Sequence, residues 1–176
     1  MKKIAFLDRD GTLNIEKDYV HKWSDFEWID GAKDFIRELK SRKYFVAVVT
    51  NQSGIARSFY TANDVVQLHL KMNDDLKKSH GVEIDRFEIC PHHPDFSGPC
   101  TCRKPETNML RRVVNFAGHY DDQSTFMVGD NLSDYQAGKN FRIKSFLVQS
   151  GHGAKFIDKV EDQSIITNLN EIFEKL

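Results

Sequence analysis

The stretch KKIAFLDRD, residues 2–10, runs from two lysines through four apolar residues to Asp8 and Asp10. A short apolar run bounded by polar residues is typical of a buried strand. Residues 44–50, YFVAVVT, form a second run of aromatic and β-branched side chains, which indicates a strand covered on both sides. Both segments therefore predict strands inside a sheet, with other elements packed on each face.

Around these two strands, the sequence alternates between the period of a helix and the period of a strand. Helices are expected over 31–42, after an N-cap at Thr61, over 109–118, between residues 130 and 144, and over the last stretch, 165–176. Further strands are expected over 84–90, 125–130 and 144–150. Strands separated by helices predict an α/β fold, with a doubly wound, Rossmann-like parallel sheet between two helical layers. The chain has no repeat and no low-complexity linker, so we expect one domain over residues 1–176.

The composition excludes several classes of protein. Apolar residues make up 40% of the chain and charged residues 29%, with a formal net charge of −1. No stretch approaches the ~18 apolar residues of a membrane span, and no basic block indicates a nucleic-acid partner. The first apolar run is too short for a signal peptide. Three cysteines, an odd number, do not suit a disulfide framework. We therefore expect a cytoplasmic protein, monomeric, without nucleic-acid or membrane partners.

Reactive side chains fall where the predicted strands end. Asp8 and Asp10 follow the first strand, Thr50 ends the second, Asp130 follows the strand at 125–130, and Lys104 lies just before a helix. Ligands of such sheets bind at the carboxyl ends of the strands, near the point where the strand order reverses. Three acids, a hydroxyl and a lysine at that edge favour phosphate chemistry.

The electrostatic reason concerns like charges. A carboxylate that attacks a phosphate dianion is repelled unless a cation neutralises both, and Mg²⁺ held by carboxyl-type oxygens does so. A lysine and a hydroxyl can hold the phosphoryl group while its charge shifts. One aspartate can act as the nucleophile, and a second can transfer protons to and from oxygen.

Two simpler interpretations compete with this one. A lone D-x-D pair arises often by chance, and a Gly-Asp pair after a strand is often only a turn. A phosphate-receiving signalling domain also uses acids, threonine and lysine on a parallel sheet. In this chain, however, the second strand ends in Thr50 without an acid, and Asp10 supplies a hydrolytic base that a receiver lacks. The ordered occurrence of all these residues favours an enzyme.

All three cysteines lie within residues 90–102, as Cys90-x-His92 and Cys100-x-Cys102. Three sulfurs and one imidazole suit a closed tetrahedral Zn²⁺ site, although His93 is equally near by spacing alone. Free buried thiols do not suit a loop this polar, and Cys100 and Cys102 are too close for an unstrained disulfide in most backbones. Four protein ligands leave no open position, so a structural zinc ion is expected, which stiffens the loop before Arg103 and Lys104.

The sequence resembles a known superfamily at four places. FLDRDGTLN (6–14), VVTNQSGIAR (48–57), CRKP (102–105) and MVGDNLSD (127–134) resemble the four motifs of the haloacid dehalogenase superfamily of phosphohydrolases. Within it, DYVH (18–21), DFEWIDGA, NQSGIAR and the cysteine loop look like the D-glycero-D-manno-heptose 1,7-bisphosphate 7-phosphatases. Histidinol-phosphate phosphatases share the cysteine loop and the first motif, and they are the alternative with the same chemistry.

The resemblance implies a role for each matching residue. Asp8 would be the nucleophile and a Mg²⁺ ligand, and Asp10 the general acid/base with its backbone carbonyl on the metal. Asp130 would complete the Mg²⁺ site, and His92 would be the fourth zinc ligand. The catalytic set would also include residues that hold the phosphoryl group: Thr50, Arg103 and Lys104. The substrate contacts would be Glu16, Lys17, Asp18, Tyr19, Thr50, Asn51, Gln52, Ser53, Arg103, Lys104 and Asn131.

The resemblance also implies a small sugar phosphate as the partner, in the biosynthesis of ADP- or GDP-heptose for lipopolysaccharide or capsule. The spacing of the motifs leaves no room for a separate cap domain, so three loops at about 14–28, 54–60 and 90–102 are expected to control access. Asn131 departs from the lysine that is common at this place in the family, and it offers no charge. His69 and His80 are expected to be solvated helix residues.

Overall fold

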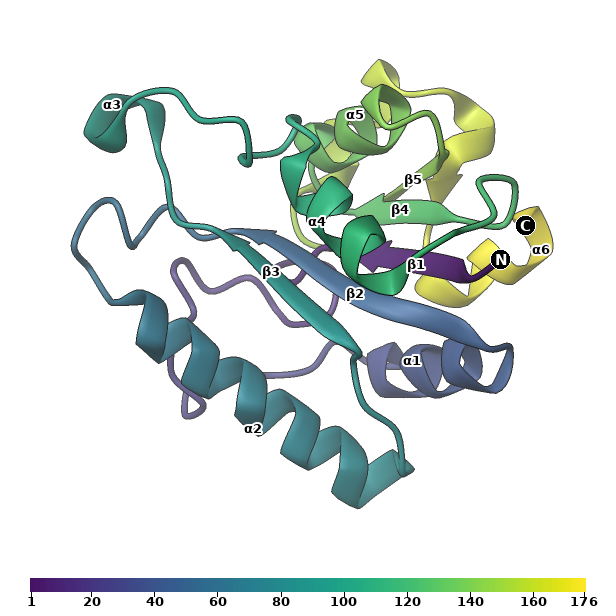
Figure 1. Ribbon diagram of the computed structural model, residues 1–176, viewed down its shortest axis with the longest axis horizontal. Helices are drawn as coiled ribbons and strands as arrows, with labels where there is room; N and C mark the ends of the chain where they lie inside the picture. The colour runs from purple at the N-terminus through teal and green to yellow at the C-terminus, as the bar shows by residue number, and fades with distance from the viewer.

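The computed structural model describes residues 1–176 and contains one six-stranded sheet (Figure 1). All paired strands are parallel, in the order β3-β2-β1-β4-β5-β6. The strands are β1 Lys3–Leu7, β2 Tyr44–Asn51, β3 Arg86–Cys90, β4 Phe126–Gly129, β5 Lys144–Val148 and β6 Ile165–Ile166. The predicted α/β class and the doubly wound sheet are confirmed.

Strand β1 lies at the centre of the sheet, where the strand order reverses. On one side Ala5 pairs with Val46 of β2, and on the other it pairs with Phe126 of β4. The chain therefore proceeds outward from β1 to β3, and then returns to the opposite side of β1 to add β4. The connections that follow β1 and β4 lead to helices on opposite faces of the sheet, and in such sheets a ligand usually binds between them.

Helices cover both faces of the sheet, as the run of apolar residues in β1 requires. Ala5 and Leu7 pack with α1 (Ala32–Ser41) and α2 (Ala62–His80). Ile4 and Phe6 face the opposite layer, where α4 (Asn108–Ala117) packs, and α5 (Leu132–Asn140) lies against β4 and β5. All four of these β1 side chains have no exposed surface. None of the helices combines the length and apolar character that a membrane span needs.

Helix α2 begins where the sequence predicted. Thr61 is the N-cap, and its side chain and that of Asp64 form a reciprocal capping box. The expectation that His69 is solvated is wrong, because this side chain is only 4% exposed. His69 follows Val65 by four residues and precedes Met72 by three, so it lies within the buried stripe of the helix.

The expected helix over 165–176 is wrong for most of its length. Its first residues form β6 beside β5, a 3₁₀ turn (η4) follows at Leu169–Glu171, and only α6, Ile172–Lys175, is α-helical. Strand pairing and burial against α1 outweigh the local helical pattern.

The sequence analysis also missed α3, Pro94–Ser97, in the cysteine loop. Three further 3₁₀ turns follow β5: η1 Gly153–Lys155, η2 Ile157–Lys159 and η3 Asp162–Ser164.

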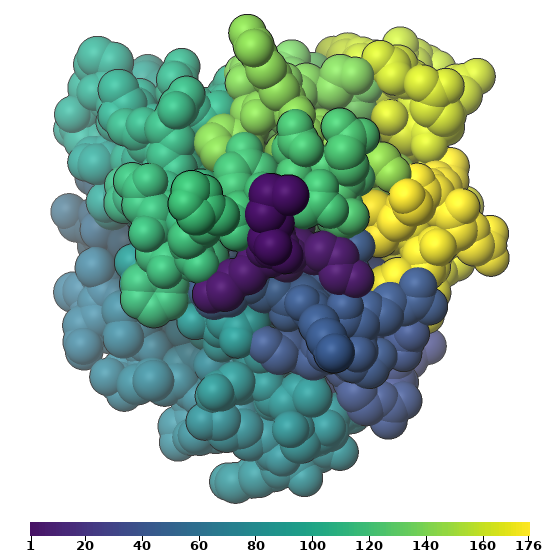
Figure 2. Space-filling view, turned by 45° about the vertical axis from the view of Figure 1, so that its right-hand side comes forward, coloured from purple at the N-terminus to yellow at the C-terminus, as the bar shows by residue number.

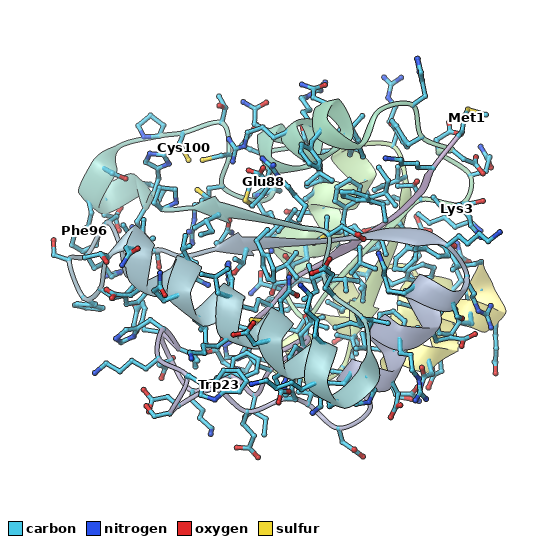
Figure 3. The ribbon with its side chains drawn as sticks, turned by 60° about the horizontal axis from the view of Figure 1, so that its bottom comes forward. Met1, Lys3, Trp23, Glu88, Phe96 and Cys100 are labelled. Atoms are coloured by element: carbon cyan, nitrogen blue, oxygen red, sulfur yellow. The ribbon has the colours of Figure 1, made fainter.

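The two ends of the sheet have different surroundings. Figure 2 shows the N-terminal segment at the surface, between the segment that precedes β4 and the segment that joins α1 to β2. The cysteine loop lies at the opposite end: Figure 3 places Cys100 and Phe96 far from Met1 and Lys3. The loops that follow β1, β2 and β4 extend toward the cysteine-loop end, and this is the end at which the reactive side chains collect.

Candidate active site

A cavity of about 460 Å³ lies at the carboxyl ends of β1, β2 and β4. Of its 17 lining residues, only two are hydrophobic. The sequence predicted most of the lining: Asp8, Asp10, Glu16, Asp18, Tyr19, Thr50, Asn51, Gln52, Ser53, Arg103, Lys104, Asp130 and Asn131. It missed Tyr60, Ser133, Asp134 and His152. The ends of the parallel strands therefore bring together residues as far apart in the sequence as Asp8 and His152.

Lys104 connects two acids at the base of the cavity. Its ammonium lies 2.6 Å from a carboxylate oxygen of Asp8 and 2.6 Å from one of Asp134, and it donates to the carbonyl of Val49 at 2.7 Å. Asn51 makes two hydrogen bonds to the backbone of Lys104: its side-chain oxygen accepts from the Lys104 N–H, and its side-chain NH2 donates to the Lys104 carbonyl. The lysine is thus fixed, fully charged, beside the nucleophile expected from the sequence.

At the bottom of the cavity, acidic side chains outnumber the single lysine. Burial, followed by the carboxylate of Asp134, raises the pKa of Asp8 well above its ordinary value, although the ammonium of Lys104 opposes the rise. Burial also raises the pKa of Asp130 to about 7, against the effect of the backbone N–H of His152. For Lys104, burial lowers the pKa, but Asp134 and Asp8 outweigh it and the net pKa is raised. Three buried acids thus surround a single ammonium, which contacts two of them, Asp8 and Asp134.

This cluster has the composition of a magnesium site. Carboxylate oxygens of Asp8, Asp130 and Asp134 lie within 4.8 Å of one another, and all three residues are buried. Hard divalent cations prefer oxygen ligands, and the excess of negative charge is what such a cation neutralises. The sequence identified Asp8 and Asp130. It missed Asp134 as a member of the cluster, although this residue stands in the fourth motif.

Glycines hold Asp130 in a narrow space. A Cβ atom on Gly11 or on Gly151 would collide with the Asp130 carboxylate, and both glycines have positive φ angles, +77° and +54°. The N–H of His152 donates to Oδ2 of Asp130 at 2.7 Å. The segment after β5 therefore orients an acid that follows β4, a contact that the linear motifs do not reveal.

Asp10 is held apart from the cluster of three acids. Its carboxylate accepts hydrogen bonds from Arg9, from Asn14 at 3.1 Å and from Gln52 at 2.8 Å. Gln52 also donates to the hydroxyl of Thr50 and accepts from Tyr60. Gln52, which was expected to contact substrate, lines the cavity and also uses its amide for these protein contacts.

The thiols form a compact group with one imidazole. The Sγ atoms of Cys90, Cys100 and Cys102 and the Nδ1 atom of His92 are separated by 3.1–3.8 Å in the five closest pairs. A zinc tetrahedron with Zn–S bonds of ~2.3 Å has edges of about 3.8 Å, so the ion would fit this group once the contacts of Cys102 with Cys90 and His92, at 3.1 and 3.2 Å, open slightly. His93, the alternative by spacing, caps α3 and faces Arg57 instead.

The cysteine group is joined directly to the active-site arginine. The backbone N–H of Arg103 points to Sγ of Cys100 at 3.4 Å, and its guanidinium donates to the carbonyl of His92 at 3.2 Å. Two further residues were expected to contact substrate, and only one of them lines the cavity. Lys17 lies outside the cavity lining and pairs with Glu27 at 2.8 Å. Asn131 lines the cavity, and its side chain also caps α5.

Comparison with known proteins agrees with this geometry. The sequence profile of the family described as polynucleotide kinase 3 phosphatase matches residues 3–170. The D-glycero-beta-D-manno-heptose-1,7-bisphosphate 7-phosphatase of Pasteurella multocida is 42% identical over 156 residues, covering 86% of this chain and 84% of that protein. The protein of the same name from Haemophilus influenzae is 39% identical, covering 100% of this chain and 99% of its own.

A solved structure extends the likeness to three dimensions. The D,D-heptose 1,7-bisphosphate phosphatase from B. bronchiseptica, complexed with magnesium and phosphate, superposes with a TM-score of 0.88 at 30% sequence identity, covering 99% of both chains. The matched range, residues 3–170, spans all four motifs, and the resemblance seen in the sequence is confirmed. The chain therefore belongs to the D-glycero-β-D-manno-heptose-1,7-bisphosphate 7-phosphatase family and is a phosphatase of the haloacid dehalogenase superfamily.

Proposed function

We propose that this phosphatase removes the 7-phosphate of D-glycero-β-D-manno-heptose 1,7-bisphosphate, releasing the heptose 1-phosphate and inorganic phosphate. The observation that carries the substrate is the 39% identity, over the full length of both chains, to the Haemophilus influenzae protein of that name. The cavity supports it, because a polar lining with carboxylates at Glu16 and Asp18 suits a ligand with several hydroxyl groups.

The reaction proceeds in two half-reactions. In the first, a carboxylate oxygen of Asp8 attacks the phosphorus, the bond to the oxygen of carbon 7 breaks, and Asp10 gives its proton to that oxygen. In the second, Asp10 takes a proton from water as the water attacks the aspartyl phosphate, which releases phosphate and restores Asp8. Thr50, Arg103 and Lys104 hold the phosphoryl oxygens during both steps.

Magnesium belongs to the same proposal. The carboxylates of Asp8 and Asp130 and the backbone carbonyl of Asp10 hold the ion, whereas Asp134 stays paired with Lys104. When bound, Mg²⁺ neutralises the carboxylates and the phosphate and so permits an anion to attack an anion. The solved relative contains magnesium and phosphate together. We further propose that Cys90, His92, Cys100 and Cys102 bind a structural Zn²⁺ ion.

Phosphate release tests the substrate. With Mg²⁺ present, kcat/KM is measured for the α and β anomers of heptose 1,7-bisphosphate and for histidinol phosphate. We expect the β anomer to be preferred by about tenfold or more, since a well-formed pocket separates close isomers by ~1–3 kcal/mol. A preference for histidinol phosphate, or equally poor rates with all three, contradicts the proposed substrate and leaves the phosphatase chemistry standing.

Replacing Gly151 by Ala is expected to weaken Mg²⁺ binding about tenfold or more, because the new methyl group displaces the Asp130 carboxylate. Isothermal titration with Mg²⁺ measures the change. The matched control is Gly81→Ala, which meets a similar backbone strain, φ +68°, at the end of α2, where a Cβ has no neighbour within 4 Å. Equal Mg²⁺ affinity in the Gly151 variant and the wild type would show that this contact does not orient the acid.

Removing zinc is expected to lower both the melting temperature and kcat, because Arg103 is held by backbone and side-chain contacts to the cysteine group. A zinc-selective chelator is applied with Mg²⁺ in excess, and elemental analysis follows the zinc content. Restoring Zn²⁺ should restore both properties. If zinc-free, magnesium-loaded protein keeps full activity, the loop does not depend on the metal to place the arginine.

A further inference from the structure

An arginine without any exposed surface lies between the two aspartates of the first motif. Arg9 is 0% exposed, and its guanidinium donates from Nη2 to both carboxylate oxygens of Asp10 at 2.9 Å. The same nitrogen donates to the carbonyl of Val20 at 2.5 Å. Of the three side chains that donate to Asp10, only Arg9 is charged. A planar guanidinium that contacts both oxygens fixes the orientation of a carboxylate as well as its position.

The remaining end of this guanidinium contacts His69. Nη1 of Arg9 lies 3.4 Å from Nε2 of His69, a residue of α2 that is 4% exposed. The imidazole ring stacks on Phe87 of β3, with 4.3 Å between ring centroids and 17° between planes. His69 does not line the cavity. It therefore has a fixed ring and a contact with Arg9, and no access to the reacting atoms.

The chemistry of the pair determines the state of the histidine. Arginine carries only donors and stays charged, so Nε2 of His69 must be the acceptor and the ring proton must be on Nδ1. Burial, and then the charge of Arg9, lowers the pKa of His69 well below its ordinary value, which agrees with a neutral ring. A hydrocarbon side chain at this position would leave a buried guanidinium N–H without an acceptor.

We infer that His69 is a positioning residue for the reaction: it holds Arg9, and Arg9 fixes the carboxyl group of Asp10 in line with the leaving oxygen. This inference rests on the proposed role of Asp10 as general acid and base. It gives α2 a part in the chemistry through the contact of His69 with Arg9 and the contact of Arg9 with Asp10. No side chain of α2 itself lines the cavity. This chain of contacts from His69 through Arg9 to Asp10 requires a hydrogen-bond acceptor at the place of Nε2 and does not require an aromatic ring.

Two variants separate this role from packing. In His69→Gln, the amide oxygen can occupy the place of Nε2 and accept from Arg9, whereas His69→Leu has a similar size and no acceptor. For a phosphate monoester that the wild type hydrolyses, we expect the Leu variant to lose about tenfold or more in kcat with KM changed less than twofold, since small misplacements of catalytic groups have such effects. The Gln variant should keep kcat within about twofold of the wild type.

A double-mutant cycle with Asp10→Asn tests whether the effect passes through Asp10. If His69 acts only by orienting that carboxyl group, His69→Leu should not lower kcat further once the carboxyl is absent. An equal loss in both backgrounds, or an equal loss in the Gln and Leu variants, overturns the inference. If Asp10→Asn itself leaves kcat unchanged, the proposed function of Asp10 has failed, which is a different result.

A measurement without turnover covers the case in which the Leu variant does not fold. Nitrogen-15 spectra of histidine-labelled wild-type protein should show His69 neutral, with its proton on Nδ1, from pH 5.5 to pH 8. In Arg9→Met, where the donor is gone, the Nε2 resonance should shift. If the ring is protonated at pH 5.5, or if the proton is on Nε2, then Nε2 cannot accept a hydrogen bond from Arg9 and the inference is overturned.

Discussion

Asp8→Asn is expected to lower phosphate release by about 10⁴-fold or more, because the amide is neither a nucleophile nor a charged Mg²⁺ ligand. The structure favours this interpretation, since Asp8 lies against the ammonium of Lys104 at the base of the cavity. Steady-state phosphate release measures the loss, and isothermal titration should show weaker Mg²⁺ binding in the same variant.

The same substitution is expected to raise the melting temperature of the metal-free protein. The pKa of Asp8 is raised in the folded state, chiefly by burial and by Asp134, so its ionised form opposes folding near neutral pH. A neutral amide of the same shape removes that cost, and the gain should fade as the pH falls toward the ordinary aspartate range. Asp122→Asn, an exposed acid, is the matched control. Appreciable hydrolysis by Asp8→Asn would point to direct attack by water.

Asp10→Asn is expected to slow both half-reactions by about 10²- to 10⁴-fold, the usual contribution of a general acid or base. Mg²⁺ affinity should change less than about twofold, because the backbone carbonyl remains. Arg9, Asn14 and Gln52 all donate to the Asp10 carboxylate, so the amide oxygen of the variant keeps an acceptor for some of these donors, whereas its NH2 group accepts none.

Rapid-quench experiments separate the two steps. With p-nitrophenyl phosphate, whose leaving group needs no proton, the first half-reaction of Asp10→Asn should recover toward the wild-type rate. The second still lacks its base, so aspartyl phosphate should accumulate on Asp8. If the variant loses Mg²⁺ binding, or if both substrates are slowed equally without an intermediate, Asp10 is not the proton-transfer group.

Local patterns predicted the elements that carry most of the fold. Continuous apolar runs predicted the central strands because both faces of the sheet are covered. The capping box at Thr61 set the start of α2. The prediction failed at residues 165–176, where pairing of β6 with β5 overrides a helical pattern. It also failed at His69, because the polarity of the side chain suggested exposure to solvent, whereas its spacing placed it in the buried stripe of α2.

The sequence by itself determined the chemical groups of this protein: the acids, lysine and thiols occur at strand ends and in one loop, and their order matches a known superfamily. Only the tertiary structure decided how they cooperate. It placed Lys104 between Asp8 and Asp134, confined Asp130 between Gly11 and Gly151, and buried Arg9 against Asp10 and His69. The physical reason is that strand ends are local features, whereas orientation and charge balance come from contacts between segments that lie far apart in the chain.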